Sequence, residues 1–361
     1  MIYAVDLAVE DYRNFEYRRL ELSRGTTILV GRNAVGKTNL VEALQILTAG
    51  QSFRRPSPTE LVRDGAARAR AALRLEGEGR RVDMELEVEE GKRRFRRNGK
   101  ACLARGVRGV LPSVLFCPDD LDMVKRSASV RRRALDDFGS QLNEQYARLA
   151  AAYERTVEQR NALLKEAACD PVTMGAWNES FAAAAAALTL HRRALLRRIS
   201  ARFEEVYRRI APSEEATVSY ESSVGALTEN EGREGLAGRI LARLEELAAE
   251  ERRRGLTLVG PHRDEVTFSI DGRPARAYGS QGQQRSVVLA WKMAEVEVTR
   301  DIAGHPPLLL LDDVMSELDE HRRERLMEFV EGEIQTVVTT TNLGYFSDEK
   351  VRSSYVVEVG A

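Results

Sequence analysis

One eight-residue segment constrains the fold of this chain more than any other. It follows the β-branched stretch 26–30 and precedes a helical pattern from Asn39 to Leu47. Its residues match the pattern G-x-x-x-x-G-K-[ST] and are Gly31, Arg32, Asn33, Ala34, Val35, Gly36, Lys37 and Thr38. A strand, a tight loop and a helix in this order indicate an α/β fold with a phosphate-binding loop.

The residue types in the loop suit phosphate chemistry. Gly31 and Gly36 allow the backbone to curl around phosphate oxygens, because glycine has no Cβ in the way. The exposed N–H groups and the start of the following helix favour negative charge. Lys37 is expected to be largely exposed until phosphates arrive, and the Thr38 hydroxyl suits Mg²⁺. The segment predicts a site for a nucleoside triphosphate.

A second candidate part of this site lies far along the chain. Residues 308–311 are four consecutive leucines, followed by Asp312 and Asp313, a pattern typical of a buried parallel strand that ends at a nucleotide. Asp312 is expected to hold Mg²⁺ and Asp313 to polarise an attacking water. Because Asp312 comes 275 positions after Lys37 (312 − 37), a large insertion separates the two halves.

A polar, glycine-containing segment precedes this strand. It runs from Tyr278 to Ser286 and leads into a helical pattern that continues to Val298. Ser280, Gly282 and Gln283 lie at the predicted helix start, where backbone N–H groups favour an anion. By itself the segment is equally consistent with a capped turn.

Charge is distributed unevenly along the chain. The net charge is −1, with 31% charged residues. Residues 91–108 carry eight Lys or Arg and no acid, and residues 123–133 carry five more, again without an acid. Each cluster alone is consistent with a solvated charged face, whereas several together favour a surface that binds a polyanion.

Composition excludes other classes of protein. No run approaches 18 apolar residues, so no transmembrane helix is predicted, and the first residues lack the pattern of a signal peptide. Cys102, Cys117 and Cys169 have no metal-site spacing, which favours packing roles and a cytoplasmic location. The four histidines, His191, His262, His305 and His321, show no such spacing either.

The periodicity of apolar residues changes twice along the chain, from strand-like to helical and back to strand-like. Helical periodicity predicts long helices over residues 131–165, 173–210 and 233–254, with strand patterns and the turn signals Glu90-Gly91, Asn98-Gly99 and Asp271-Gly272 outside them. Strand patterns therefore occupy both ends of the chain, and helical patterns its middle.

Taken together, these segments resemble the ABC-type ATPase heads of SMC-like DNA repair proteins. The resemblance is closest to the RecF family of bacterial DNA replication and repair proteins, and it covers essentially the whole chain. The segments that carry it are residues 31–40, 116–121, 130–133, 260–264, 279–285 and 311–319.

The resemblance implies an ATP-binding lobe from residues 1–118 and 300–361, and a second lobe over residues 119–299. This second lobe contains the helical arm and the S-x-G-Q segment, Ser280–Gln283. The resemblance also implies a function. Two subunits would hold two ATP molecules between them, with each phosphate loop facing Ser280–Gln283 of the partner subunit. ATP, with Mg²⁺, would control homodimerisation and the binding of single-stranded and duplex DNA at gaps. RecO and RecR would act with it to load RecA in recombination, replication and the SOS response.

The sequence departs from the wider ABC pattern at three places. Gln281 stands where transporters commonly have Gly, Asp313 stands where a catalytic Glu is usual, and Thr341-Asn342 follows the strand without a histidine. These departures imply weak ATP hydrolysis that serves as a switch. The open alternatives are an SMC-like structural ATPase, a transport ATPase subunit and a P-loop enzyme with a second catalytic centre.

Overall fold

The computed structural model describes residues 1–166, 170–330 and 333–360, which form two compact units. The first unit comprises Met1–Asp120 and Leu289–Ala361, and the second comprises Leu121–Val288. The chain therefore enters the second unit after Asp120 and returns before Leu289. The return to the first unit, between Val288 and Leu289, lies in the first half of one continuous helix, α8, over Gln281–Ala303. The boundary expected between residues 299 and 300 lies near the end of the same helix.

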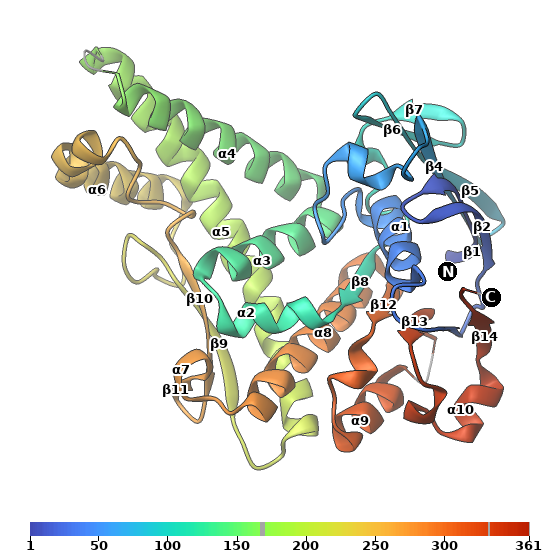
Figure 1. Ribbon diagram of the computed structural model, residues 1–361. Helices are drawn as coiled ribbons and strands as arrows, with labels where there is room; N and C mark the ends of the chain where they lie inside the picture. The colour runs from blue at the N-terminus through green and yellow to red at the C-terminus, as the bar shows by residue number, and fades with distance from the viewer. Residues whose placement is uncertain (167–169, 331–332, 361) are drawn as a thin grey trace. The chain divides into compact units, whose positions relative to one another are not determined.

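A five-stranded parallel sheet forms the centre of the first unit (Figure 1). Its order is β14-β3-β13-β12-β8, so strands from both ends of the chain lie side by side. The central strands β12 and β13 are fully buried, which agrees with the four leucines of β12 and the β-branched valines and threonines of β13. The strands are β3 Thr26–Val30, β8 Ser113–Phe116, β12 Leu308–Asp312, β13 Thr336–Thr340 and β14 Tyr355–Glu358.

A six-stranded antiparallel sheet completes the core of this unit. Apolar residues alternate with charged ones along its strands, so one face is buried and the other faces solvent. The predicted turns at 90–91 and 98–99 are confirmed, since all four residues have a positive φ between 50° and 73°. The strands are β1 Tyr3–Tyr12, β2 Phe15–Glu21, β4 Arg68–Gly77, β5 Arg80–Glu89, β6 Lys92–Arg97 and β7 Lys100–Cys102.

Helix α1, over Lys37–Ala49, packs into the same core as both sheets. Leu44 and Leu47 of α1 share this core with Leu86 of β5 and Leu310 of β12. The other helices wholly in this unit are α9 Glu320–Val330 and α10 Asp348–Ser353, and its short 3₁₀ turns are η1 Pro58–Leu61, η2 Ala104–Gly106, η4 Val314–Ser316 and η5 Leu343–Tyr345.

The second unit is mainly helical. Helix α5, over Pro171–Ile210, packs against α4, Glu144–Leu164, on one side and α6, Arg233–Arg254, on the other (Figure 1). Within the alanine run of α5, Ala182, Ala185 and Ala186 are fully buried, as expected for close helix contacts. The remaining elements are η3 Pro118–Leu121 at its border, α2 Asp122–Lys125, α3 Ala128–Leu142, α7 Ala275–Tyr278 and the sheet of β9 Ala216–Glu221, β10 Glu265–Ile270 and β11 Arg273–Pro274.

The long helix expected over residues 131–165 is wrong. Two helices, α3 and α4, replace it, because Asn143 adopts an extended conformation between them. The Asn143 side chain accepts hydrogen bonds from the N–H groups of Gln145 and Tyr146 and so caps α4.

None of the helices over the described ranges is long and apolar enough to cross a membrane. Cys169 lies outside the described residues.

Candidate nucleotide-binding site

The loop between β3 and α1 requires glycine at two positions. Gly36 has a φ of 106°, and a Cβ there would lie 2.5 Å from the Phe15 ring. A Cβ on Gly31 would lie 2.3 Å from the carbonyl oxygen of Val359, which follows β14. Real Cβ atoms do not approach this closely, so a side chain at either position would force the loop or its neighbours to move. The packing around the loop therefore requires glycine at both positions, and their expected role at phosphates stays a prediction.

Lys37 is buried, contrary to expectation. Its exposed fraction is 7%, and Nζ donates to the carbonyl oxygens of Gly31 at 2.7 Å and Arg32 at 2.8 Å. The ammonium folds over its own loop because the loop carbonyls satisfy its donors. Burial lowers the pKa of Lys37, while the nearby carboxylates of Asp313 and Asp312 oppose this shift.

The two distant halves of the predicted site meet at Asp312. Its Oδ1 accepts hydrogen bonds from Thr38 Oγ1 at 3.0 Å and from Thr339 Oγ1 at 2.8 Å. The side chain is almost wholly buried, and burial raises the pKa of Asp312 against the lowering effect of these two hydroxyls. A carboxylate beside a hydroxyl at the end of a parallel strand suits a hard divalent cation.

No cluster of three or more His, Cys, Asp or Glu suitable for a metal occurs within the described part of the chain. A magnesium ion here would therefore need phosphate oxygens and water as further ligands, which is its usual mode at nucleotides. The side chains of Thr38 and Asp312 fit that mode.

Asp313 lies at the same end of β12 in an unusual conformation. Its φ is 54°, in the left-handed region that non-glycine residues seldom adopt. Its N–H donates to Thr339 Oγ1 at 2.9 Å, so a single hydroxyl holds both aspartates in place. Such local strain is typical of positions held for function.

Further polar residues support the loop and were missing from the prediction. Asn14 donates to the Val35 carbonyl at 3.0 Å and accepts from Asn39 at 2.8 Å, and Arg54 donates to Asn39 at 2.8 Å. Glu42 is the available sequence signal, because it is a charged residue on the apolar face of α1. It is fully buried and accepts from Arg13, Ser52 and Tyr12.

The S-x-G-Q segment lies in the second unit, at the start of α8. The Ser280 N–H donates to Gln283 Oε1 at 2.8 Å, and the Gln283 N–H donates to Ser280 Oγ at 3.2 Å. This reciprocal pair is a capping box. Ser280 and Gln281 are exposed, and the Ser280 hydroxyl still has its own proton to donate.

The basic cluster at residues 123–133 is only partly available to a ligand. Arg131 is buried and binds Glu265 at 2.9 and 3.0 Å, and Arg132 donates to the Asp264 carbonyl at 2.6 Å. These two arginines hold α3 to the segment around β10, so their guanidinium groups are already engaged within the protein. Lys125, Arg126 and Arg133 remain exposed.

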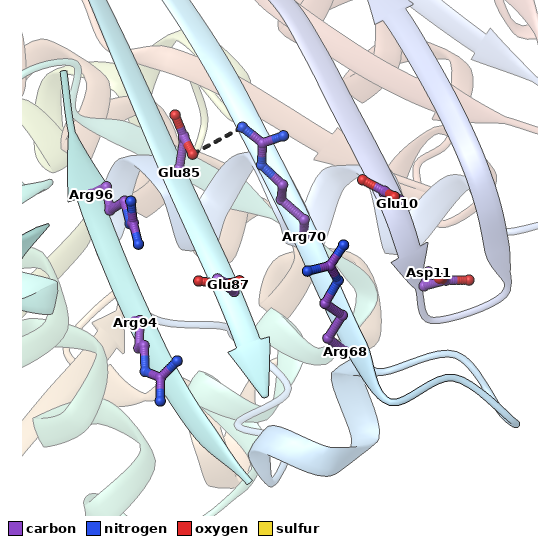
Figure 2. A pocket seen from close by; sticks show the side chains of 8 residues that line it. All are labelled: Glu10, Asp11, Arg68, Arg70, Glu85, Glu87, Arg94 and Arg96. Carbon is purple, nitrogen blue, oxygen red and sulfur yellow. Dashed lines mark hydrogen bonds and ion pairs between the residues drawn. The ribbon is translucent and has the colours of Figure 1, made fainter. Parts of the chain in front are cut away.

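The first basic cluster is divided between the two faces of β6. Arg94 and Arg96 lie on the solvent face, beside Glu85 and Glu87 of β5 (Figure 2). With neighbouring strands they line a shallow cavity of about 260 Å³ that contains as many acids as arginines. Arg97 belongs to the other face, as Phe95 does, but is exposed at the strand end.

Comparisons with known proteins agree with this geometry. The model of the RecF/RecN/SMC N-terminal domain matches residues 3–358. A protein of Gloeobacter violaceus named DNA replication and repair protein RecF is 38% identical over 97% of this chain and 95% of its own length. The chain belongs to the RecF family.

Solved structures of RecF-family proteins support the same assignment. Two are described as the recombination mediator protein RecF in the RecFOR pathway, one as RecF-ATPrS and one as RecF-ATP. Their TM-scores are 0.90 and 0.89 at 27% and 29% identity, over 100% and 96% of this chain and 98% and 93% of theirs. The predicted fold, an ABC-type ATPase head, is confirmed.

Proposed function

We propose that this chain is an ATP-controlled DNA-binding protein of recombinational repair and replication. The observation that carries the proposal is the meeting of Lys37 and Thr38 with Asp312, which assembles a phosphate loop and a carboxylate from opposite ends of the chain. The description of a similar structure as RecF-ATP supports ATP as the nucleotide.

Residues of the first unit have separate roles in binding and hydrolysing the nucleotide. The N–H groups of the loop and the start of α1 hold the phosphates, and Lys37 leaves the Gly31 and Arg32 carbonyls to contact them. Thr38 and Asp312 would hold Mg²⁺, whose charge would offset that of the phosphates. Asp313 orients the attacking water, and its short side chain is consistent with slow hydrolysis that resets a switch.

The S-x-G-Q segment completes the site of a second copy. Ser280 is exposed at a helix start, where its hydroxyl and neighbouring N–H groups can meet the γ-phosphate held by a partner subunit. Two heads related by two-fold symmetry then enclose two ATP molecules. ADP lacks the γ-phosphate and therefore does not hold the dimer together.

DNA and mediator proteins are the partners of this dimer. The RecFOR pathway named in the descriptions of similar structures supports mediators of the RecO and RecR type. RecA loading at gaps is the outcome that we propose. Exposed cations of the two clusters, including Lys92, Arg97, Lys125 and Arg133, are candidates to track the DNA backbone with little base readout.

Measuring ATP hydrolysis by the purified protein with and without gapped DNA tests the proposal. We expect slow hydrolysis that increases severalfold with DNA, and no increase with an unrelated polyanion such as heparin. Hydrolysis that is fast and indifferent to DNA would contradict the proposal and favour a transport ATPase. A location in the cytoplasm follows from the proposed role.

Sedimentation with ATP and with ADP tests the dimer separately. Wild-type protein should double its mass with ATP alone, whereas Ser280→Arg should bind ATP normally and remain a monomer. If wild type keeps its mass, or if Ser280→Arg dimerises normally, the two-site arrangement is wrong.

A further inference from the structure

A buried ionic cluster lies in the first unit, away from the loop. Lys292 of α8 binds Asp120 Oδ1 at 3.1 Å and Glu295 Oε2 at 3.3 Å. The indole of Trp291 donates to Glu295 Oε1 at 2.7 Å. The three charged side chains are between 5% and 16% exposed.

The cluster stands where the chain passes between its two units. The chain leaves the first unit after Asp120 and re-enters it at Leu289, which lies about one helical turn before Lys292. The ion pair therefore joins the two segments of the first unit from which the chain crosses to and from the second unit. Asp120 is itself held by the Cys117 N–H, which donates to its Oδ2 at 2.8 Å.

Stability alone does not account for such a cluster. Two carboxylates and one ammonium lose favourable hydration energy when they are buried, and their mutual attraction compensates for only part of this loss. Apolar residues of similar size commonly stabilise a protein equally well at such positions. Burial would lower the pKa of Lys292, but Asp120 and Glu295 outweigh it and raise that pKa, so the lysine stays charged. What the ion pair adds over apolar packing is a fixed geometry.

Asp120 is connected to β12 and Asp312, and Lys292 is connected to the first turn of α8. Asp120 follows β8, and β8 pairs in register with β12, which ends in Asp312. Lys292 lies eleven residues after Gln281 in one continuous helix, about 16 Å along its axis. A rigid helix fixed at Lys292 has its first turn fixed as well.

We infer that the Asp120–Lys292 ion pair is a positioning device that transmits nucleotide binding at β12 to the first turn of α8. This inference rests on the proposed function, in which that turn meets the partner's ATP. Neither residue is among those proposed to contact the nucleotide. Both act indirectly, because their ion pair joins the segment after β8 to α8.

Hydrogen exchange in the full-length protein tests the inference. The measurement uses Ser280→Arg protein, which is expected to remain a monomer, so that contact with a second subunit does not protect α8. In this parent we expect ATP to change exchange in residues 281–288. Adding Lys292→Met should leave ATP affinity within about threefold and reduce the ATP-dependent change at least about tenfold, a range typical of coupling between sites.

Three further variants control for a general loss of structure. Lys292→Met, Asp120→Asn and Glu295→Gln combined remove all the charges, so that none is left buried without a partner, and should show the same loss. Lys292→Arg keeps the cation and should restore the response. Lys350→Met replaces a lysine of α10 that belongs to neither the ion pair nor the nucleotide site and should change neither quantity.

The outcomes separate this inference from the proposed function. If the parent binds no ATP, both are overturned. If the parent binds ATP and residues 281–288 do not respond, the inference is overturned while the nucleotide site stands. If the parent responds and the folded triple variant responds equally, the ion pair does not transmit the signal.

Discussion

Thr38 and Asp312 are joined by a hydrogen bond of 3.0 Å although 274 positions separate them in the chain. Strand β12 brings them together, because it lies in the same parallel sheet as β3, with β13 between the two. The carboxyl ends of parallel strands meet at one edge of the sheet, so the loop after β3 and the aspartates after β12 share that edge. The proposed ATP site depends on this pairing of the two ends of the chain.

Replacing Lys37 with Met should weaken ATP binding by about 30-fold, equivalent to about 2 kcal/mol, because Met cannot make a charge-assisted hydrogen bond to phosphate. The fold should remain, since Met has a similar volume and the hydrogen bonds that Lys37 makes go to carbonyls of a surface loop. Titration with a fluorescent ATP analogue and a thermal melt provide the two readouts. Lys350→Met is the matched control, and wild-type affinity in Lys37→Met would refute the loop assignment.

Asp312→Asn and Asp313→Asn should differ in what they remove. Asp312→Asn should lower the affinity for ATP in Mg²⁺ but change it little in EDTA, because the cation loses its anionic ligand. Asp313→Asn should preserve ATP affinity and slow single-turnover hydrolysis at least about 100-fold, a typical effect of losing a group that activates water. Asp348→Asn, on exposed α10, is the control. Wild-type hydrolysis by Asp313→Asn would exclude the proposed role of Asp313.

The two faces of β6 should contribute unequally to DNA binding. Arg96 pairs across the strands with Glu85, whose charge opposes a nearby phosphate, whereas Arg97 is exposed on the other face and lies opposite Met84. In a plot of log affinity against log salt concentration, Arg97→Gln should reduce the slope by about one unit for each phosphate that the arginine neutralises in wild type. Arg96→Gln should reduce it less. Equal slopes for wild type and both variants would leave β6 as a solvated face.

His262 should make the stability of the second unit depend on pH. Burial lowers the pKa of His262 from 6.5 to about 4, against the opposing effect of the Thr257 carbonyl. Its ring is satisfied when neutral, since Nδ1 accepts from the Tyr153 hydroxyl at 2.5 Å and Nε2–H donates to the Thr257 carbonyl at 3.0 Å.

Between pH 6.5 and 4 the unfolded chain binds a proton that the folded chain excludes, so stability falls as pH falls through this range. The expected loss reaches about 3 kcal/mol at pH 4, as an upper limit from the shift of the pKa. Denaturant unfolding of wild type and His262→Gln at several pH values measures it. The variant should be less stable at pH 7 and show a weaker dependence on pH, whereas exposed His321→Gln should retain it. Parallel pH profiles for wild type and His262→Gln would exclude His262 as the cause.

Local patterns in the sequence determined the elements that depend on near neighbours. The phosphate loop and both of its glycines, the hairpin turns at 90–91 and 98–99, the apolar strand before Asp312 and the capped start of α8 all follow from residues within one or two turns of the chain. Family membership was also accessible, because several such segments occur in a characteristic order.

Tertiary structure decided what depends on distant partners. Arg131 and Arg132 bind the first residue of β10 and the residue before it, and Thr339 holds Asp312 and Asp313. No local pattern indicates these interactions. A run of basic residues looks the same in sequence whether its charges face DNA or a carboxylate brought close by folding. The physical reason is that a buried charged side chain loses its hydration and needs a partner that compensates for this loss. For Arg131 and Arg132 that partner lies more than 100 residues away in the chain.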